Sequence, residues 1–195
     1  TYRGDSAIDS RTNVLAYPYD FRHSVAQAAQ ELDRAVESVL RQQGPNDAER
    51  RVIVLAHSLG GLVARYWIGP LGGWRRCAAL LTLGTPHRGA PKALGWLVNG
   101  VEMGAARHPR ATRALRSWPS MYELLPQYPA VWEEASDRAI EFDTFPRGYP
   151  KLTARMHGLL TPFERMAAAG RKVHEDIRIG WSNIPESQVP QFHVL

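Results

Sequence analysis

The stretch Ala56-His57-Ser58-Leu59-Gly60 lies between an apolar run at residues 52–55 and a segment at residues 61–67 whose composition predicts a helix. A strand, a tight turn and a helix with a serine at the apex form a nucleophile elbow, which presents the serine hydroxyl above a sheet. The turn holds the serine backbone in a strained conformation and leaves room only for small residues two positions before and after it. Because these residues are alanine and glycine, we expect Ser58 to be an exposed nucleophile.

The backbone next to the serine is suited to stabilising negative charge. The N–H of Leu59 lies at the N-terminus of the predicted helix, where the helix dipole and free amide groups favour an anion. His57 and Gly61 complete, together with Ala56 and Gly60, the residues that we expect to shape the turn. The alternative interpretation is an ordinary strand, turn and helix in which the serine only caps the helix.

Length and composition indicate one globular unit. A chain of 195 residues with 44% hydrophobic residues can bury one core. No apolar run reaches the roughly 18 residues needed to cross a bilayer, and no signal peptide is visible. The single cysteine, Cys77, excludes an internal disulfide, and we expect it to be buried. Neither metal-ligand spacing nor a glycine-rich phosphate loop is present, so we expect no metal and no cofactor.

The net charge of +5 comes almost entirely from arginine, since lysine occurs only at positions 92, 151 and 172. A nucleic-acid site would need basic residues gathered on one face with aromatic residues between them. The sequence has no such pattern, so we expect no nucleic-acid partner and no integral membrane segment. We expect a soluble protein, with the cytoplasm favoured and secretion as the alternative if an upstream signal has been removed. The oligomeric state stays open.

The first half of the chain alternates predicted strands and helices. Residues 13–17 and 78–83 are apolar runs that end at proline or glycine, as strands do. Residues 25–40 carry apolar side chains three or four positions apart behind Ser24, a predicted N-cap. Apolar strands separated by amphipathic helices are typical of a parallel sheet covered on both faces. A last run at 191–195 predicts the start of another strand.

After Gly89 the pattern changes to short segments rich in proline, tryptophan and tyrosine. We expect helices at residues 93–98, 131–140 and 162–177. Long insertions over an active site usually have a function, so we interpret this region as a helical cap; the alternative is a set of surface helices on one sheet face. The predicted organisation is a core at residues 1–89, a cap at 90–175 and a return to the core at 176–195.

Four segments stand out together: Tyr17-Pro18-Tyr19-Asp20-Phe21-Arg22, the elbow region 56–65, Leu83-Gly84-Thr85-Pro86-His87-Arg88-Gly89-Ala90, and PSMYELLP at 119–126. In this order and spacing they resemble the lecithin:cholesterol acyltransferase-like branch of the α/β-hydrolases, from about residue 14 to residue 126. The resemblance implies an α/β-hydrolase fold, a mostly parallel sheet with helices on both faces and a cap insertion. It also implies serine acyl transfer on ester substrates, often lipids, through an acyl-enzyme.

Carried onto this chain, the resemblance implies that Ser58 is the nucleophile and that Leu59 supplies one oxyanion-hole N–H. We expect Asp20 and Arg22 to stabilise their own loop. The loops near the site would carry Tyr19, Asp20, Thr85, Pro86 and His87.

The chain lacks two parts of the family pattern. A serine nucleophile needs a positioned histidine and a carboxylate, which in this fold follow the serine in the chain. The family's Gly-Asp-Gly-Thr-Val-Pro-like stretch and the histidine beyond it are absent from the sequence, as are the earlier strand and loop that give the second oxyanion N–H. We therefore expect a chain truncated at both ends and nearly inactive on its own. We interpret His87 as organising its loop, His57 as a packing or hydrogen-bonding residue that points away from the serine, and His174 as solvated.

Three functions are compatible with these residues. The first is a serine esterase, lipase or O-acyltransferase that acts on lipid-like esters. The second is a catalytically incomplete α/β-hydrolase-like binding module, which the missing acid and histidine favour. The third is a peptide or thioester hydrolase. The aromatic and apolar composition of the predicted cap favours a substrate with an acyl chain.

Overall fold

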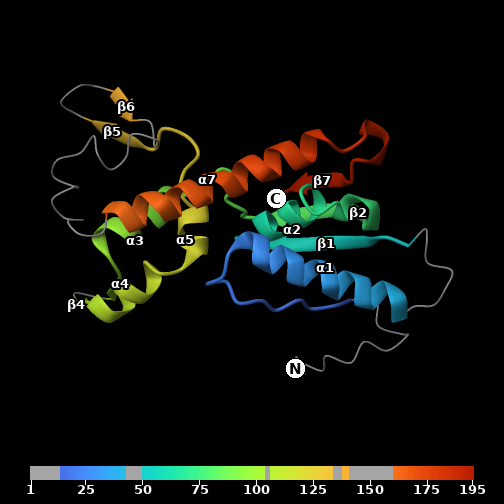
Figure 1. Ribbon diagram of the computed structural model, residues 1–195, viewed down its shortest axis with the longest axis horizontal. Helices are drawn as coiled ribbons and strands as arrows, with labels where there is room; N and C mark the ends of the chain where they lie inside the picture. The colour runs from blue at the N-terminus through green and yellow to red at the C-terminus, as the bar shows by residue number, and fades with distance from the viewer. Residues whose placement is uncertain (1–13, 43–49, 104–105, 134–137, 141–159) are drawn as a thin grey trace.

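A parallel sheet of three strands forms the centre of the structure (Figure 1). The computed structural model describes residues 14–42, 50–103, 106–133, 138–140 and 160–195. The strands β1 (Val52–His57), β2 (Cys77–Leu83) and β7 (Gln191–Val194) lie in the order β1-β2-β7, and both pairs are parallel. Their carboxyl ends meet at the same edge of the sheet, so the loops that follow the strands gather there.

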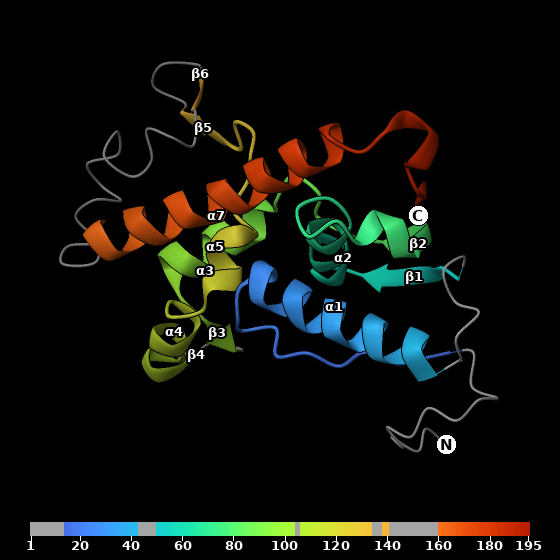
Figure 2. The ribbon, with the colours of Figure 1, turned by 45° about the vertical axis from the view of Figure 1, so that its right-hand side comes forward.

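Three helices share one buried core with this sheet (Figures 1 and 2). They are α1 (Val25–Gln42), α2 (Gly60–Ile68) and α7 (Leu160–Ser182). Buried apolar residues three or four positions apart, from Val25 to Val36, form one side of α1. Ser24 is the N-cap of α1, as predicted, because its hydroxyl accepts the Gln27 N–H at 3.1 Å.

The strand residues alternate between this core and the opposite face. Ala56 and Leu80 point into the core and are buried, whereas Ile53 and Leu55 are each 70% exposed. Within the described residues, the helices therefore cover one face of β1, where the sequence predicts cover on both faces. Short 3-10 turns precede β2 and β7; they are η2 (Gly73–Arg76) and η4 (Glu186–Gln188).

Residues 14–17 do not form the strand that the sequence predicts. The described segment 14–20 runs beside α1 without a paired strand, and Val14 is 80% exposed (Figure 1). An apolar run becomes a strand only where a neighbour completes its backbone hydrogen bonds. Tyr17 fixes this segment instead, since its hydroxyl donates to the carbonyl of Ala28 in α1 at 2.9 Å.

A second, smaller core lies at the other end of α7. Its buried residues include Leu97, Leu125 and Phe163. The helix α7 continues from this cluster to the first core, where its residues Val173 and Ile177 are buried. One helix of 23 residues therefore joins the two cores. The other elements in this part of the chain are α3 (Pro91–Asn99), β3 (Glu102–Met103), β4 (Ala106–Arg107), α4 (Pro109–Leu115) and α5 (Pro119–Glu123).

The helix predicted at residues 131–140 is wrong. The antiparallel strands β5 (Val131–Glu133) and β6 (Arg138–Ile140) occupy this stretch, with Val131 opposite Ile140. Short apolar runs of this length fit helix and strand periodicity equally well. The helices predicted near 93–98 and 162–177 and the strands predicted near 52–55, 78–83 and 191–195 are all confirmed.

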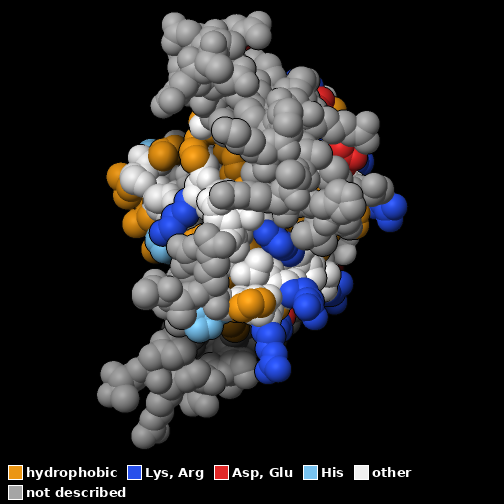
Figure 3. Space-filling model, turned by 90° about the vertical axis from the view of Figure 1, so that its left-hand side faces the viewer, with side chains coloured by type: hydrophobic (Ala, Val, Ile, Leu, Met, Phe, Trp, Pro, Cys, Tyr) orange, Lys and Arg blue, Asp and Glu red, His pale blue; other side chains and the backbone are white. Residues whose placement is uncertain are grey.

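The basic composition is visible at the end of the molecule that carries the second core. On that face several Lys and Arg side chains and few acidic ones are seen (Figure 3). None of the described helices combines the length and the apolar character needed to span a bilayer.

Candidate active site

Ser58 occupies the turn between β1 and α2 in a left-handed backbone conformation. Its φ angle is +53°, and no other non-glycine residue in the described ranges has a positive φ. The Ser58 N–H donates to the carbonyl of Leu83 at 2.9 Å, and the Ser58 carbonyl accepts the Gly61 N–H at 3.1 Å. A serine held this way costs about 1–3 kcal/mol. The turn is therefore strained, as the sequence predicts, and bonds to β2 and α2 hold it.

The tightest packing around this turn is at Gly61. A Cβ at Gly61 would lie 2.1 Å from the Thr85 Oγ1, a distance at which one of them must move. A Cβ at Gly60 would lie 3.6 Å from the Tyr19 hydroxyl oxygen and 3.9 Å from the Ala56 Cβ, which are ordinary contacts. The strictest size limit thus falls one residue later than the sequence predicts, because the loop after β2 packs directly on the first turn of α2.

The Leu59 N–H is available to a ligand. Leu59 is the N-cap residue of the nine-residue helix α2, and its carbonyl accepts the N–H groups of Leu62 at 2.9 Å and Val63 at 3.2 Å. Its own N–H donates to no carbonyl among the backbone hydrogen bonds of the described residues. Free amide groups at the start of a helix attract negative charge.

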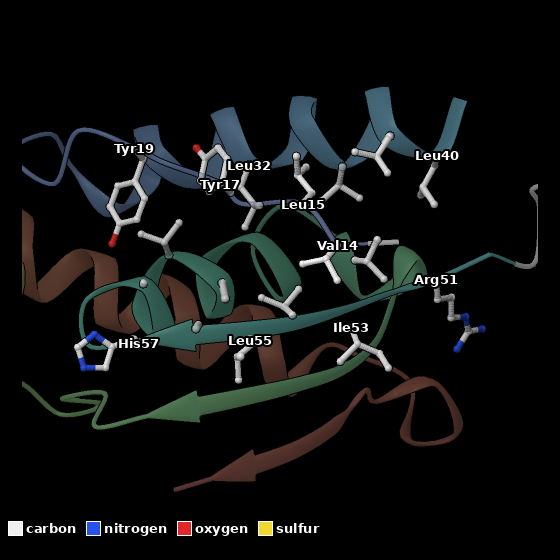
Figure 4. Close-up of a pocket in the computed structure, with 18 of the residues that line it drawn as sticks. Val14, Leu15, Tyr17, Tyr19, Leu32, Leu40, Arg51, Ile53, Leu55 and His57 are labelled. Carbon is white, nitrogen blue, oxygen red and sulfur yellow. The ribbon is translucent and has the colours of Figure 1, made fainter. Parts of the chain in front are cut away.

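His57 lies at the end of β1 with an exposed side chain (Figure 4). Its imidazole makes no hydrogen bond with a residue that the structure describes. The prediction of a packing or hydrogen-bonding histidine is therefore wrong for this part of the chain. The physical reason is alternation along the strand, since His57 shares the uncovered face with Ile53 and Leu55.

The loop before α1 carries two features that the sequence singled out. The Asp20 carboxylate accepts hydrogen bonds from the Arg22 backbone N–H at 3.0 Å and side-chain Nε at 2.8 Å. This bonding holds the pKa of Asp20 well below its usual range, and it stabilises the loop as expected. Next to this pair, the rings of Tyr17 and Tyr19 stack with centroids 5.9 Å apart.

His87 belongs to a hydrogen-bonded chain in the loop after β2. The Arg65 Nη1 lies 3.4 Å from its Nδ1, which must accept, so its Nε2–H donates to the Thr82 Oγ1 at 3.1 Å. The Thr82 hydroxyl in turn donates to the carbonyl of His193 at 3.3 Å. Burial, and secondarily the charge of Arg65, lower the pKa of His87. This arrangement favours the interpretation that His87 organises its loop.

The residues directly after α5 also hold this loop. The Ala90 N–H donates to the carbonyl of Leu124 at 2.8 Å, and the Gly89 N–H donates to that of Pro86 at 2.9 Å. Gly89 has a φ of +79°, and a Cβ there would lie 2.1 Å from the carbonyl oxygen of Leu125. Only glycine fits this close approach, so the loop packs directly on the backbone that follows α5.

Arg65 is a site residue whose role sequence reasoning missed. Its guanidinium is largely buried over the rings of Trp181 and Phe192, at 5.7 and 6.0 Å from their centroids. Burial lowers the pKa of Arg65. Its Nε and the Thr85 Oγ1 are the two buried side-chain polar atoms without a hydrogen-bond partner in the described ranges. The sequence did carry a signal for this role, because Arg65 is the one charged residue in the otherwise apolar helix α2.

Glu123 and His174 were also missed, and the prediction that His174 is solvated is wrong. Glu123 is 4% exposed, and its Oε2 accepts the Val25 N–H at the start of α1 at 2.7 Å. Its carbonyl accepts the His174 Nε2–H at 2.7 Å. Burial raises the pKa of Glu123 to about 7 and lowers that of His174. An acidic residue inside the apolar PSMYELLP segment was the signal in the sequence.

A groove of about 580 Å³ follows the outer edge of β1, between this strand, α1 and residues 14–19 (Figure 4). Its wall is mostly apolar, and it reaches the elbow at His57 and Gly60. No group of three metal-ligating side chains occurs among the described residues. Cys77 is buried as predicted, and burial raises its pKa to about 12.

Comparison with known proteins decides the family. The model of the lecithin:cholesterol acyltransferase family matches residues 6–157, well over half of the chain. The chain belongs to this family. A comparison with curated proteins gave no match.

Four chains of solved structures are also similar to this family member, and one is in the crystal structure of the Tle4–Tli4 complex. The two chains are 19% identical with a TM-score of 0.59, over 82% of this chain and 41% of that one. The present chain therefore spans less than half the length of that neighbour. The likeness confirms the α/β-hydrolase fold that the sequence predicts.

Proposed function

We propose that the protein is a serine-nucleophile acyl hydrolase or O-acyltransferase that acts on lipid-like esters. The observation that carries this proposal is the left-handed backbone of Ser58, at the turn between a parallel strand and a helix. Strain of this kind persists where it serves function. Membership of the lecithin:cholesterol acyltransferase family supports acyl transfer on lipids in general.

In the proposed reaction the Ser58 Oγ forms a bond to the ester carbonyl carbon and gives its proton to a general base. The carbonyl π electrons move to the oxygen, and the Leu59 N–H stabilises the resulting anion. Collapse of this intermediate expels the alcohol, which takes up the proton and leaves an acyl-enzyme. Water or a second alcohol then accepts the acyl group by the same steps.

The general base of this reaction is a histidine outside the described residues. No described histidine hydrogen-bonds to Ser58. The Nε2 of His87 donates to Thr82 and that of His174 donates to the carbonyl of Glu123, so neither Nε2 can take the proton. We infer that residues 1–195 alone have little or no esterase turnover.

The cap assignment is part of the proposal. Residues 90–175 would form a cap over Ser58, with residues 1–89 and 176–195 as the catalytic core. The separate apolar cluster around Leu97, Leu125 and Phe163 supports this division. The hydrogen bond between Ala90 and Leu124 supports a firm connection to the loop beside the elbow. An apolar cap suits an acyl chain.

The test is ester turnover by the full-length protein and its variants. Ser58→Ala should abolish cleavage of a p-nitrophenyl acyl ester, because it removes the attacking oxygen. Ser182→Ala is the matched control, since the hydroxyl of this exposed serine at the end of α7 donates, among the described residues, only to the nearby carbonyl of Ile179. Turnover that survives in Ser58→Ala would refute the proposal.

A binding module on the same fold is the second candidate. It is favoured by one observation, the lack of a hydrogen bond between Ser58 and any described histidine. The same experiment separates the two candidates. A full-length protein that cleaves no acyl ester, yet binds one without turnover, would favour the module.

A further inference from the structure

The two stacked tyrosines of the loop before α1 differ in one respect. The Tyr17 hydroxyl donates to the carbonyl of Ala28 at 2.9 Å, so its hydrogen bond is used inside the fold. The Tyr19 hydroxyl makes no hydrogen bond with a described residue. Tyr19 is half-buried and lines the groove beside β1, where Figure 4 shows its hydroxyl pointing toward the elbow. A phenol group placed this way has a donor to offer to a ligand.

The free hydroxyl lies against the turn that carries the proposed nucleophile. Its oxygen is 3.6 Å from the position of a Cβ at Gly60, two residues after Ser58. The unbonded N–H of Leu59 belongs to the residue directly before Gly60. Two unused donors, one from the backbone and one from a side chain, therefore flank the same turn.

The position of Tyr19 is fixed before any substrate arrives. Its ring stacks on that of Tyr17, and the next residue, Asp20, is held by Arg22 through hydrogen bonds of 2.8 and 3.0 Å. Burial raises the pKa of Tyr19, so the phenol keeps its proton near neutral pH. A donor that needs no reorganisation is the kind that stabilises developing charge most effectively.

We propose that the Tyr19 hydroxyl donates a hydrogen bond to the oxyanion that forms when Ser58 attacks an ester carbonyl. This inference rests on the proposed function. In it, Tyr19 and the Leu59 N–H bind the same oxygen atom. No bond to Tyr19 is made or broken, and its proton stays on the phenol.

The experiment compares Tyr19→Phe with Tyr17→Phe in the full-length protein, using a p-nitrophenyl acyl ester and a fluorophosphonate probe. Tyr19→Phe removes a hydroxyl that has no hydrogen-bond partner among the described residues, so the Tm should stay unchanged. Its kcat should fall on the order of 100-fold, as for loss of one oxyanion donor, with KM within about threefold. The rate of probe labelling should fall in parallel. Tyr17→Phe should lower the Tm and leave kcat unchanged.

The outcomes separate the two proposals. A kcat of Tyr19→Phe equal to that of the wild type overturns the role of Tyr19, whatever happens to the Tm. A fall confined to the Tm, or a rise confined to KM, overturns it as well. Retention of turnover in Ser58→Ala instead overturns the proposed function itself. Loss of turnover in Ser58→Ala together with an unchanged Tyr19→Phe leaves the function standing and removes only this inference.

Discussion

At the scale of single residues, Ser58 combines a chemical role with a conformational cost. A left-handed φ suits glycine and strains a residue with a Cβ. The chain nevertheless has serine at φ +53°. The hydrogen bonds to Leu83 and Gly61 fix this geometry. A hydroxyl at this position is thus obtained at the expense of stability, a pattern found at functional sites.

This strain predicts an inverted order of stability at position 58. Ser58→Gly should be more stable than Ser58→Ala by about 1 kcal/mol, because glycine adopts this φ freely. In a helix interior the order is the opposite, with alanine more stable by a similar amount. Urea unfolding of the two variants measures the difference. Equal stabilities, or a more stable alanine variant, would show that the turn is not strained.

The sequence predicted the strained turn at Ser58, but neither the position of its strictest size limit nor the buried groups behind it. The small residues and the serine are read from spacing alone. Arg65 and Glu123 depend on burial between segments far apart in the chain, which no local pattern reports. The size limit at Gly61 likewise comes from Thr85, which lies 24 positions later in the sequence.

At the scale of elements, α5 links the loop after β2 to the start of α1. Glu123 accepts the first N–H of α1 through its side chain and the ring of His174 through its carbonyl. The carboxyl is nearly fully buried, so its charged form is disfavoured by desolvation. Three helices meet at this one residue.

Because of Glu123, we expect the free energy of unfolding to fall as pH rises. Its pKa rises from 4.5 to about 7 on folding, so the folded state binds the proton more tightly. The contribution of protonated Glu123 to the stability of the folded state is fully present below pH 4.5 and is lost as pH rises through about 7. It amounts to at most about 3 kcal/mol. Urea unfolding of the wild type and Glu123→Gln from pH 5 to pH 8 measures it.

Glu123→Gln is the matched control because its amide oxygen still accepts the Val25 N–H. The variant should lose this pH dependence and become more stable than the wild type as pH rises. The lowered pKa of His174 makes the stability of the folded state fall as pH falls in the acid range. The nearby Tyr66 has a raised pKa. Both groups are common to the two proteins, so their effects cancel in the difference. A difference that does not change between pH 5 and pH 8 would exclude a neutral Glu123.

The elements themselves were predictable where their apolar pattern is long. The periodicity of α1 and the apolar strands β1 and β2 decided their type. The strand predicted at 14–17 and the helix predicted at 131–140 were wrong because a short apolar run does not specify its pairing partner. Residues 14–17 need a neighbouring strand, and the described residues give them only α1.

At the scale of the whole molecule, apolar surface remains on the sheet. Ile53 and Leu55 are each 70% exposed, and Leu195 is 75% exposed. β1 is an edge strand in the order β1-β2-β7. Exposed apolar edges associate unless they are covered or charged.

Residues 1–195 expressed alone should therefore self-associate as their concentration rises. Leu55→Lys, which places a charge on this face, should reduce the association. Val189→Lys is the control, since Val189 is exposed but lies outside the strands. Sedimentation velocity over a range of concentrations measures the effect. A chain that remains monomeric throughout would show that this face does not drive association.

The most direct test of the whole account is the structure of the full-length protein after reaction with a fluorophosphonate. We expect a covalent bond from the Ser58 Oγ to phosphorus, with the phosphonyl oxygen within hydrogen-bond distance of the Leu59 N–H. Reaction at another residue, or an unreacted Ser58 in a protein that cleaves acyl esters, would contradict the assignment of the nucleophile.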